Sequence, residues 1–367
     1  MGCQTISNLP IADVNDVAAT PLLLAAIAVL LAYSLMWVTF VMLRYERREW
    51  LFRLCDPANY PAGSLLQALH QAALTRLGRR SHLTTRRGDV IESSNRRYEI
   101  VTQLARGDLT SVHYARVADQ PHLLKIADEG CRTDLRTKEQ LLAKEQRILR
   151  HLRCRAEKGS GPNSANAYGE YLPEPVELFR FAGCCVSTFR YRDGFFDASE
   201  MRRRYPQGVE GRHIAWMFNR TLEALGWVHR NGWLHGAVLP PHLLFHPDTH
   251  GLQLIGWIHA QPIGRPLKWV AREYKAWYPL ECQQRKPATP ATDIYLAAKS
   301  MVWLAGDNPT AHLSPSHMPD SMTRLLQRCL SARQSARPPD AWALHEQFRE
   351  LLEDTYGPAK FSHLQLS

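Results

Sequence analysis

The longest apolar stretch of the chain lies near its N-terminus. Residues 21–43 read PLLLAAIAVLLAYSLMWVTFVML and contain no charged side chain. As an α-helix this stretch is about 34 Å long at roughly 1.5 Å per residue, enough to cross a bilayer. A cleaved secretory signal is the alternative, but it would begin with basic residues, and residues 1–20 contain no Lys or Arg. The pattern predicts a retained transmembrane helix over 21–43, preceded by a short non-cytoplasmic tail over 1–20.

The charges on either side of this stretch predict its orientation. Asp13 and Asp16 are the only charged residues before it, and four arginines follow it closely: Arg44, Arg47, Arg48 and Arg53. Basic residues beside a membrane helix favour the cytoplasmic side. We therefore expect a single-pass protein of a bacterial inner membrane, with its N-terminus outside, the rest of the chain in the cytoplasm, and residues 21–53 in contact with lipid.

Residues 44–97 form a basic juxtamembrane region. An amphipathic run predicts a short helix over 64–77, and the Arg-, Ser- and Thr-rich residues that follow predict a linker. A second polar stretch, 155–170, predicts a loop.

From Tyr98 the spacing of apolar residues is first strand-like and then helical. Runs rich in β-branched and aromatic residues predict strands at 98–104, 110–117, 122–127, 176–183 and 184–191. Apolar residues three and four positions apart predict helices over 138–152, 212–232, 292–306, 320–330 and from 338 onward. The order predicts a strand-rich lobe over 98–191, a helical lobe over 192–356 and a tail over 357–367.

Charge and cysteine content narrow the functional classes. The net charge of +10 divides into −2 for residues 1–43, +6 for 44–97 and +6 for 98–367. The density of positive charge beside the membrane helix fits orientation and lipid contact, so we expect nucleic-acid binding by 44–97 only as an alternative. Eight cysteines form no CxxC pair, which predicts neither a zinc site nor a disulfide framework.

Several ordered motifs resemble those of the protein kinase superfamily. Gly107 and Val112 match its glycine-rich loop, Lys125 its phosphate-pairing lysine, and Glu145 the helix residue that pairs with this lysine. The stretch 226–260 is similar to the family's catalytic loop, strand hairpin and metal-binding strand end, in that order. The resemblance implies an α+β, bilobal protein-kinase-like fold behind the N-terminal transmembrane helix.

Three further positions are those that hold the helical lobe of this family together. YPLE (278–281) resembles the family's APE element, Asp293 its buried aspartate, and Arg337 is placed to pair with Glu281. The resemblance implies that all three keep structural roles.

The positions that carry the family's chemistry are changed. Ala237 stands where the resemblance places the catalytic aspartate, His242 replaces the metal-binding asparagine, and Gly256 replaces the magnesium-binding aspartate. Phosphoryl transfer needs a carboxylate to orient the hydroxyl and oxygen ligands for magnesium. We therefore expect no metal site and no required cofactor, with ATP as a candidate ligand that Gly107, Val112, Lys125 and Glu145 would hold without magnesium.

Other residues of the motif are expected to have packing roles, which depend on side-chain shape and not on charge. His235, Trp257 and Leu149 are expected to form an apolar column that links the lobes, and Lys125–Glu145 to clamp helix to sheet. His242, His246 and His250 have helical spacing, but Pro240, Pro241 and Pro247 exclude a regular helix that would align them as metal ligands.

The segment 265–278 interleaves four basic residues with aromatic ones, and it predicts either a docking surface for an acidic protein partner or packing beneath a solvated face. The sequence thus favours a membrane-anchored cytoplasmic pseudokinase that acts as a binding, scaffolding or regulatory module. An unorthodox kinase or nucleotidyl transferase that uses ATP is the first alternative, and a membrane-tethered nucleic-acid-binding protein is the second.

Overall fold

A computed structural model describes residues 85–107, 109–127, 135–158, 168–307 and 318–365. The chain divides into two compact units, 1–79 and 80–367, and every described residue belongs to the second unit. The predicted transmembrane helix over 21–43 and the predicted helix over 64–77 therefore lie outside the described residues. Within the described part, no helix is both long enough and apolar enough to span a bilayer.

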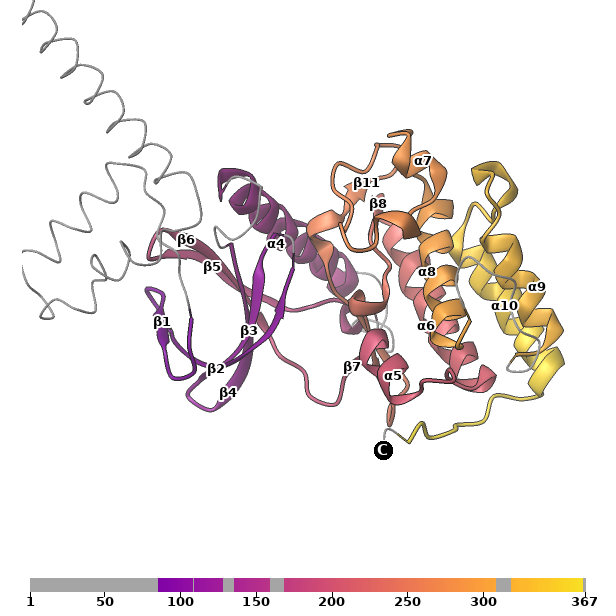
Figure 1. Cartoon of the computed structure of the whole chain (residues 1–367), viewed down its shortest axis with the longest axis horizontal. Coiled ribbons are helices and arrows are strands. Elements are labelled where there is room, and N and C mark those ends of the chain that lie inside the picture. The colour runs from indigo at the N-terminus through magenta and orange to yellow at the C-terminus, as the bar shows by residue number, and fades with distance from the viewer. Residues whose placement is uncertain (1–84, 108, 128–134, 159–167, 308–317, 366–367) are drawn as a thin grey trace, which may run out of the picture. The chain divides into compact units, whose positions relative to one another are not determined.

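The first lobe is a six-stranded antiparallel sheet with the order β1-β2-β3-β4-β6-β5 (Figure 1). The strands are β1 (Val90–Glu92), β2 (Arg97–Arg106), β3 (Ser111–Val117), β4 (Gln120–Ile126), β5 (Pro175–Phe181) and β6 (Cys184–Arg190). The sheet begins before the predicted lobe boundary at Tyr98. The reason is hydrophobic burial: Ile91 pairs with Tyr98 in the ladder and is 1% exposed, so the last residues of the predicted linker belong to the core.

A single long helix, α4 (Leu135–Lys158), packs on this sheet. It extends beyond the predicted 138–152 because the apolar spacing continues from Leu152 to Ala156, both of which are buried. The prediction of a loop over 155–170 was therefore wrong at both ends. Residues 155–158 are helical and Gly169–Tyr171 form a short 3-10 turn, η2.

The second lobe is mainly helical, as expected. Its helices are α5 (Ala198–Arg204), α6 (Gly211–Arg230), α7 (Leu280–Gln283), α8 (Pro290–Leu304), α9 (Asp320–Cys329) and α10 (Ala341–Tyr356). Two small sheets carry the motif residues: β7 (Phe196–Asp197) with β9 (Leu243–His246) and β10 (Gly251–Leu254), and β8 (Trp233–Leu234) with β11 (Gln261–Pro262). The main core cluster extends across both lobes, from Leu149 and Leu152 of α4 to Phe218 of α6 and Met301 of α8.

The C-terminal tail returns to the second lobe after α10. Leu364 is 3% exposed, and the carbonyl of Ser362 accepts a hydrogen bond from His250 Nε2 at 2.8 Å. The Phe361 ring stacks on His250, with 4.2 Å between the ring centroids.

Candidate functional site: an altered phosphotransfer centre

The loop that follows β8 is held by a buried carboxylate. Asp293, on α8, accepts hydrogen bonds from the backbone N–H groups of His235 and Gly236, each at 2.8 Å, and lies 3.0 Å from His229 Nε2. Asp293 is fully buried, so these bonds replace its lost hydration. The loop therefore has a fixed backbone, but its Ala237 side chain is a buried methyl group that can neither accept nor donate a proton.

His235 serves as a neutral structural residue. Its Nδ1 accepts the backbone N–H of Ala237 at 3.3 Å, and its Nε2 donates to the carbonyl of Ile255 at 2.8 Å. Burial lowers the pKa of His235 to about 4. Its ring meets the buried Trp257 edge-on at 4.9 Å, and Trp257 shares a core cluster with Leu149 of α4. The structure thus brings the three residues of the expected apolar column into one core.

His242 and Gly256, the positions where the resemblance places the family's magnesium ligands, face each other, and neither side chain has an oxygen atom. Gly256 is left-handed, with φ +87°, and a Cβ built there would lie 2.8 Å from three carbons of the His242 ring. The His242 Nδ1 donates to the carbonyl of Ala237 at 2.8 Å, and desolvation lowers its pKa well below 6.5. The imidazole therefore fills the space into which a side chain at position 256 would project. Among the described residues, no group of three or more His, Cys, Asp or Glu side chains could hold a metal ion.

A third histidine completes this cluster, and the sequence motifs did not single it out. The ring centroids of His259 and His242 lie 5.9 Å apart, and His259 Nδ1 donates to the carbonyl of Trp269 at 3.3 Å. Burial lowers the pKa of His259 to about 4. Lys144 was also missed: its ammonium reaches the carbonyl of Ala260 at 2.9 Å, and burial lowers its pKa to about 8. Both contacts join residues distant in sequence, so local spacing carries no signal for them.

The expected lysine–glutamate pair is present. Lys125 Nζ lies 2.6 Å from Glu145 Oε1, and the Glu145 side chain is 1% exposed. Lys125 also lies 5.2 Å from the centroid of the Phe189 ring. The second carboxylate oxygen of Glu145 has no hydrogen-bond partner among the described residues. This pair joins β4 to α4 and provides one cation at the edge of the site.

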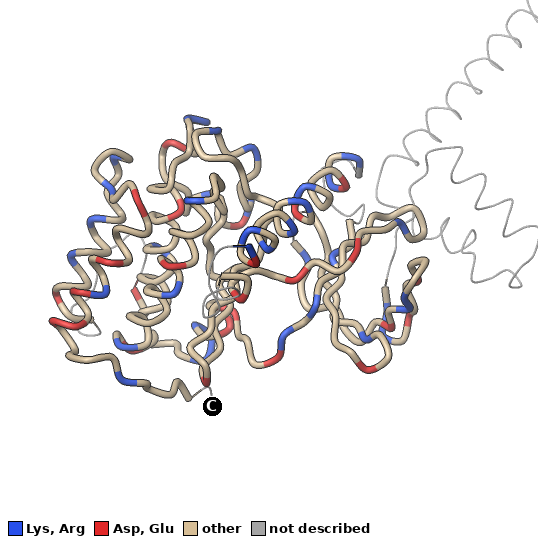
Figure 2. The backbone as a smooth tube through the Cα atoms, turned by 180° about the vertical axis from the view of Figure 1, so that it is seen from behind, with Lys and Arg blue, Asp and Glu red and all other residues tan. Residues whose placement is uncertain are grey.

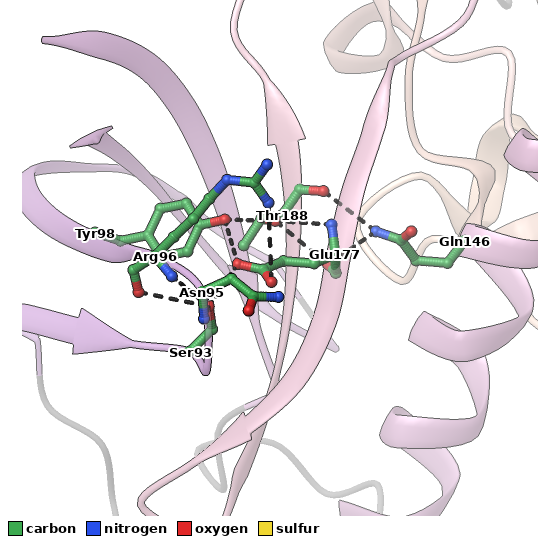
Figure 3. Close-up of polar contacts among 7 residues, drawn as sticks. All are labelled: Ser93, Asn95, Arg96, Tyr98, Gln146, Glu177 and Thr188. Carbon is green, nitrogen blue, oxygen red and sulfur yellow. Dashed lines mark hydrogen bonds and ion pairs between the residues drawn. The ribbon is translucent and has the colours of Figure 1, made fainter. Parts of the chain in front are cut away.

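The neighbour of Glu145 fixes the position of α4 on the sheet. Gln146 Nε2 donates to Ser187 Oγ at 2.9 Å. It also donates to the carbonyls of Thr188 and Glu177 at 3.2 and 3.3 Å (Figure 3). Because three acceptors on β5 and β6 converge on one amide, rotation of α4 would break several bonds at once.

The same network reaches the first turn of the sheet. The carboxylate of Glu177 accepts the Tyr98 hydroxyl at 2.6 Å and the Ser93 hydroxyl at 2.8 Å, with Arg96 3.9 Å away (Figure 3). Burial and Glu177 raise the pKa of Tyr98 to about 12. The turn between β1 and β2 is therefore joined to β5, and through β5 to α4.

The hairpin that resembles the glycine-rich loop is folded inward. Gly107 donates to the carbonyl of Thr110 at 2.9 Å across its tip, and Val112 pairs with Lys125 in the ladder. Leu109 is 8% exposed and belongs to a buried cluster with Ile258, against which Trp269 also packs. The hairpin that resembles the glycine-rich loop therefore has an apolar, buried side chain beside its tip.

The ion pair of the helical lobe forms as the motif implies. Arg337 Nη1 and Nη2 contact the two carboxylate oxygens of Glu281 at 2.6 and 3.2 Å, and both side chains are at most 5% exposed. Thr292 Oγ1 donates to the same carboxylate at 3.1 Å. The pair connects α7 with the loop before α10.

The segment 265–278 separates its basic side chains from its aromatic ones. Its basic residues are all exposed: Arg265, Lys268, Arg272 and Lys275. Its aromatic residues are partly or fully buried, and Tyr278 is 2% exposed. The Trp277 ring packs against Trp303 of α8 at 6.0 Å. The aromatic side chains thus anchor the segment while the cations face solvent.

Comparison with known proteins identifies the fold. No family model matches the chain, and no curated protein sequence matches it. Solved structures do match it. The crystal structure of the BubR1 kinase domain has a TM-score of 0.56 at 13% identity, covering 81% of this chain and 95% of that chain. The crystal structure of the Mycobacterium tuberculosis PknI kinase domain has a TM-score of 0.51 at 16% identity, covering 73% and 99%. The chain therefore has a protein-kinase-like fold.

Proposed function

We propose that this kinase-like domain is a pseudokinase: it is held at the cytoplasmic side of a membrane by residues 21–43, has lost phosphotransfer, and acts by binding a protein partner. The observation that carries the proposal is the His242 ring lying on Gly256. A lost ligand alone would leave a gap that water and magnesium could fill. Here the space is filled by an uncharged ring that is itself hydrogen-bonded to the backbone of Ala237.

The chemistry of the remaining groups supports this proposal. Phosphoryl transfer depends on magnesium held by oxygen ligands and on a carboxylate that orients the attacking hydroxyl. Ala237, His242 and Gly256 provide none of these oxygens. Lys125 keeps its ion pair with Glu145, which suits a structural clamp or a nucleotide bound without magnesium.

The structural positions support a role as a rigid binding module. Hydrogen bonds hold the buried carboxylates of Asp293 and Glu281, the second through Arg337. These bonds fix the helical lobe, and a rigid lobe can present a binding surface. We propose that an acidic protein partner docks on segment 265–278, whose exposed cations stand on an aromatic base.

Two measurements on the full chain, purified in detergent, test this function. Incubation with radiolabelled ATP and either Mg²⁺ or Mn²⁺ is expected to give no labelled protein, in itself or in acidic and basic test substrates. Thermal unfolding with ATP is expected to show either no shift or a shift that is the same with and without metal. The Lys125→Ala variant serves as the matched control.

The outcome that contradicts the proposal is equally definite. Phosphate transfer that Lys125→Ala abolishes, or stabilisation by ATP that requires the metal, would make the chain an unorthodox enzyme. In that case Lys125 and Glu145 would take part in binding and transferring the phosphate, and their role would not be only to join helix and sheet.

A further inference from the structure

The exposed face of α4 carries a basic stripe of four residues, three of them between Arg147 and Lys158. Consecutive members lie eleven, three and eight positions apart, spacings that return to one side of a helix, and all are exposed: Arg136, Arg147, Arg150 and Lys158. Cys154 is exposed on the same face. The helix has 24 residues and is about 36 Å long. Figure 2 shows Lys and Arg recurring along this helix.

The acidic residues of α4 do not neutralise the stripe. Glu145 is buried against Lys125, and Glu139 pairs with Arg180 of β5 at 2.5 Å. Glu157 is the one exposed carboxylate of the helix without such a pair in the described part of the chain. The stripe therefore presents net positive charge along most of its length.

The fold itself does not use these arginines. A neighbouring arginine shows the contrast, because Arg153 donates to the carbonyls of Gly169 and Leu172 at 2.9 and 3.2 Å and so ties α4 to η2. Among the described residues, Arg147 and Arg150 have no hydrogen bond or ion pair of this kind. Folding alone gives no reason for the charge of the stripe.

We propose that the α4 stripe docks on anionic lipid headgroups of the membrane to which the domain is anchored; this inference rests on the proposed anchoring. The 31 residues from 54 to 84 separate the juxtamembrane arginines from the described domain. Even fully extended, a segment of 31 residues spans at most about 110 Å. An anchored domain therefore stays near the bilayer, which raises the effective concentration of the stripe at its surface.

The chemistry of the stripe favours a lipid surface over a protein or a single-stranded nucleic acid. Protein docking sites and single-strand binding sites both rely on large aromatic side chains, and α4 contains no Phe, Tyr or Trp. Segment 265–278 differs from the stripe because it contains four aromatic residues beside its cations. A planar anionic surface requires only unpaired cations in a line, each of which contributes roughly fivefold to binding.

The test uses the full chain reconstituted into vesicles, with a polarity-sensitive fluorophore on Cys154. Cys3→Ser, Cys55→Ser and Cys131→Ser leave Cys154 as the accessible thiol, since Cys184, Cys185, Cys282 and Cys329 are buried. We expect blue-shifted emission in vesicles that contain phosphatidylserine and not in pure phosphatidylcholine. The Arg136→Gln, Arg147→Gln, Arg150→Gln triple variant should weaken docking about 100-fold and abolish the shift.

The matched control removes the same number of positive charges from segment 265–278. Arg265→Gln, Lys268→Gln and Lys275→Gln together should leave the shift unchanged. Equal emission in both lipids, or loss of the shift in this control, would overturn the proposal. So would a shift produced by a soluble polyglutamate peptide or by DNA and not by vesicles, which would make the stripe a docking site for another partner.

A separate readout distinguishes failure of the stripe from failure of the anchor. Resistance to alkaline extraction from pure phosphatidylcholine vesicles reports the anchor alone. Protein that resists extraction but shows no lipid-dependent shift refutes only the stripe. Protein that is extracted lacks the anchor, and binding of added phosphatidylserine vesicles then tests the stripe by itself.

Discussion

The helical lobe contains two sets of positions that resemble the kinase motif. The retained set is Asp293, Glu281 and Arg337, and the altered set is Ala237, His242 and Gly256. Around Asp293 and the Glu281–Arg337 pair, every carboxylate is kept and fully hydrogen-bonded. Around Ala237, His242 and Gly256, the oxygen ligands are gone and an imidazole ring fills the space of one of them. The difference teaches that this fold is maintained without carboxylates at the positions of the altered set.

Breaking the retained set should have the largest effect. Arg337→Ala leaves the Glu281 carboxylate buried without its partner, and we expect a loss of about 4 kcal/mol in the free energy of unfolding. Chemical denaturation of the variant and the wild type measures this loss. Arg324→Ala, an exposed position on α9, is the control and should change stability by less than about 0.5 kcal/mol. Equal effects of both changes would remove the contrast between the two sets.

Restoring a carboxylate in the altered set should also destabilise the protein. Gly256→Asp places a side chain in a left-handed backbone and within 2.8 Å of the His242 ring, so we expect a loss of about 3 kcal/mol. The double variant His242→Asn, Gly256→Asp removes the clash and should recover about 1 kcal/mol or more of it. Thermal unfolding of both variants measures the coupling.

Stabilisation of the double variant by ATP with magnesium is a second measurement on the altered set. If the double variant gains metal-dependent stabilisation by ATP, then His242 and Gly256 alone prevent metal binding at this site. If His242→Asn brings no recovery, the ring and the glycine are not complementary, and the packing argument for lost chemistry fails.

How far the sequence predicts the molecule depends on the range of each interaction. The strands β2 to β6 and the five longest helices follow from apolar spacing, whereas the short helices α5 and α7 do not. The pairs Lys125–Glu145 and Glu281–Arg337 follow from ordered motifs. The ring of His242 over Gly256, the inward Leu109 and the contact of Lys144 with Ala260 did not follow. These contacts depend on side-chain packing between segments distant in sequence, for which local spacing contains no information. β1 was missed because it has three residues and follows a polar stretch.

The buried histidines next to the altered set should make the stability of the protein depend on pH in the acid range. The pKa of His259 is about 4 in the folded protein against 6.5 for a free imidazole, because burial penalises the charged ring. Between these pH values the unfolded chain binds more protons, so stability rises with pH and is lost as the pH falls towards 4. We expect His259→Asn, which keeps a donor for the Trp269 carbonyl, to reduce the loss between pH 7 and pH 4.5 by about 2 kcal/mol. An unchanged loss in denaturation curves would show that His259 is charged or exposed in the folded state.

Removing one hydroxyl from the sheet network should have the smallest effect and the opposite pH dependence. Tyr98→Phe deletes the donor to Glu177, which keeps Ser93, so we expect a loss of about 1 kcal/mol at neutral pH. The folded pKa of Tyr98, about 12, exceeds the ordinary value of 10.0, so the folded protein binds more protons between them and its stability falls as the pH rises. The variant should lack this alkaline loss, which unfolding curves at pH 9 and pH 11 would measure. Tyr114→Phe, which alters a tyrosine on the adjacent strand, is the control, and an equal effect there would separate Tyr98 from the network that positions α4.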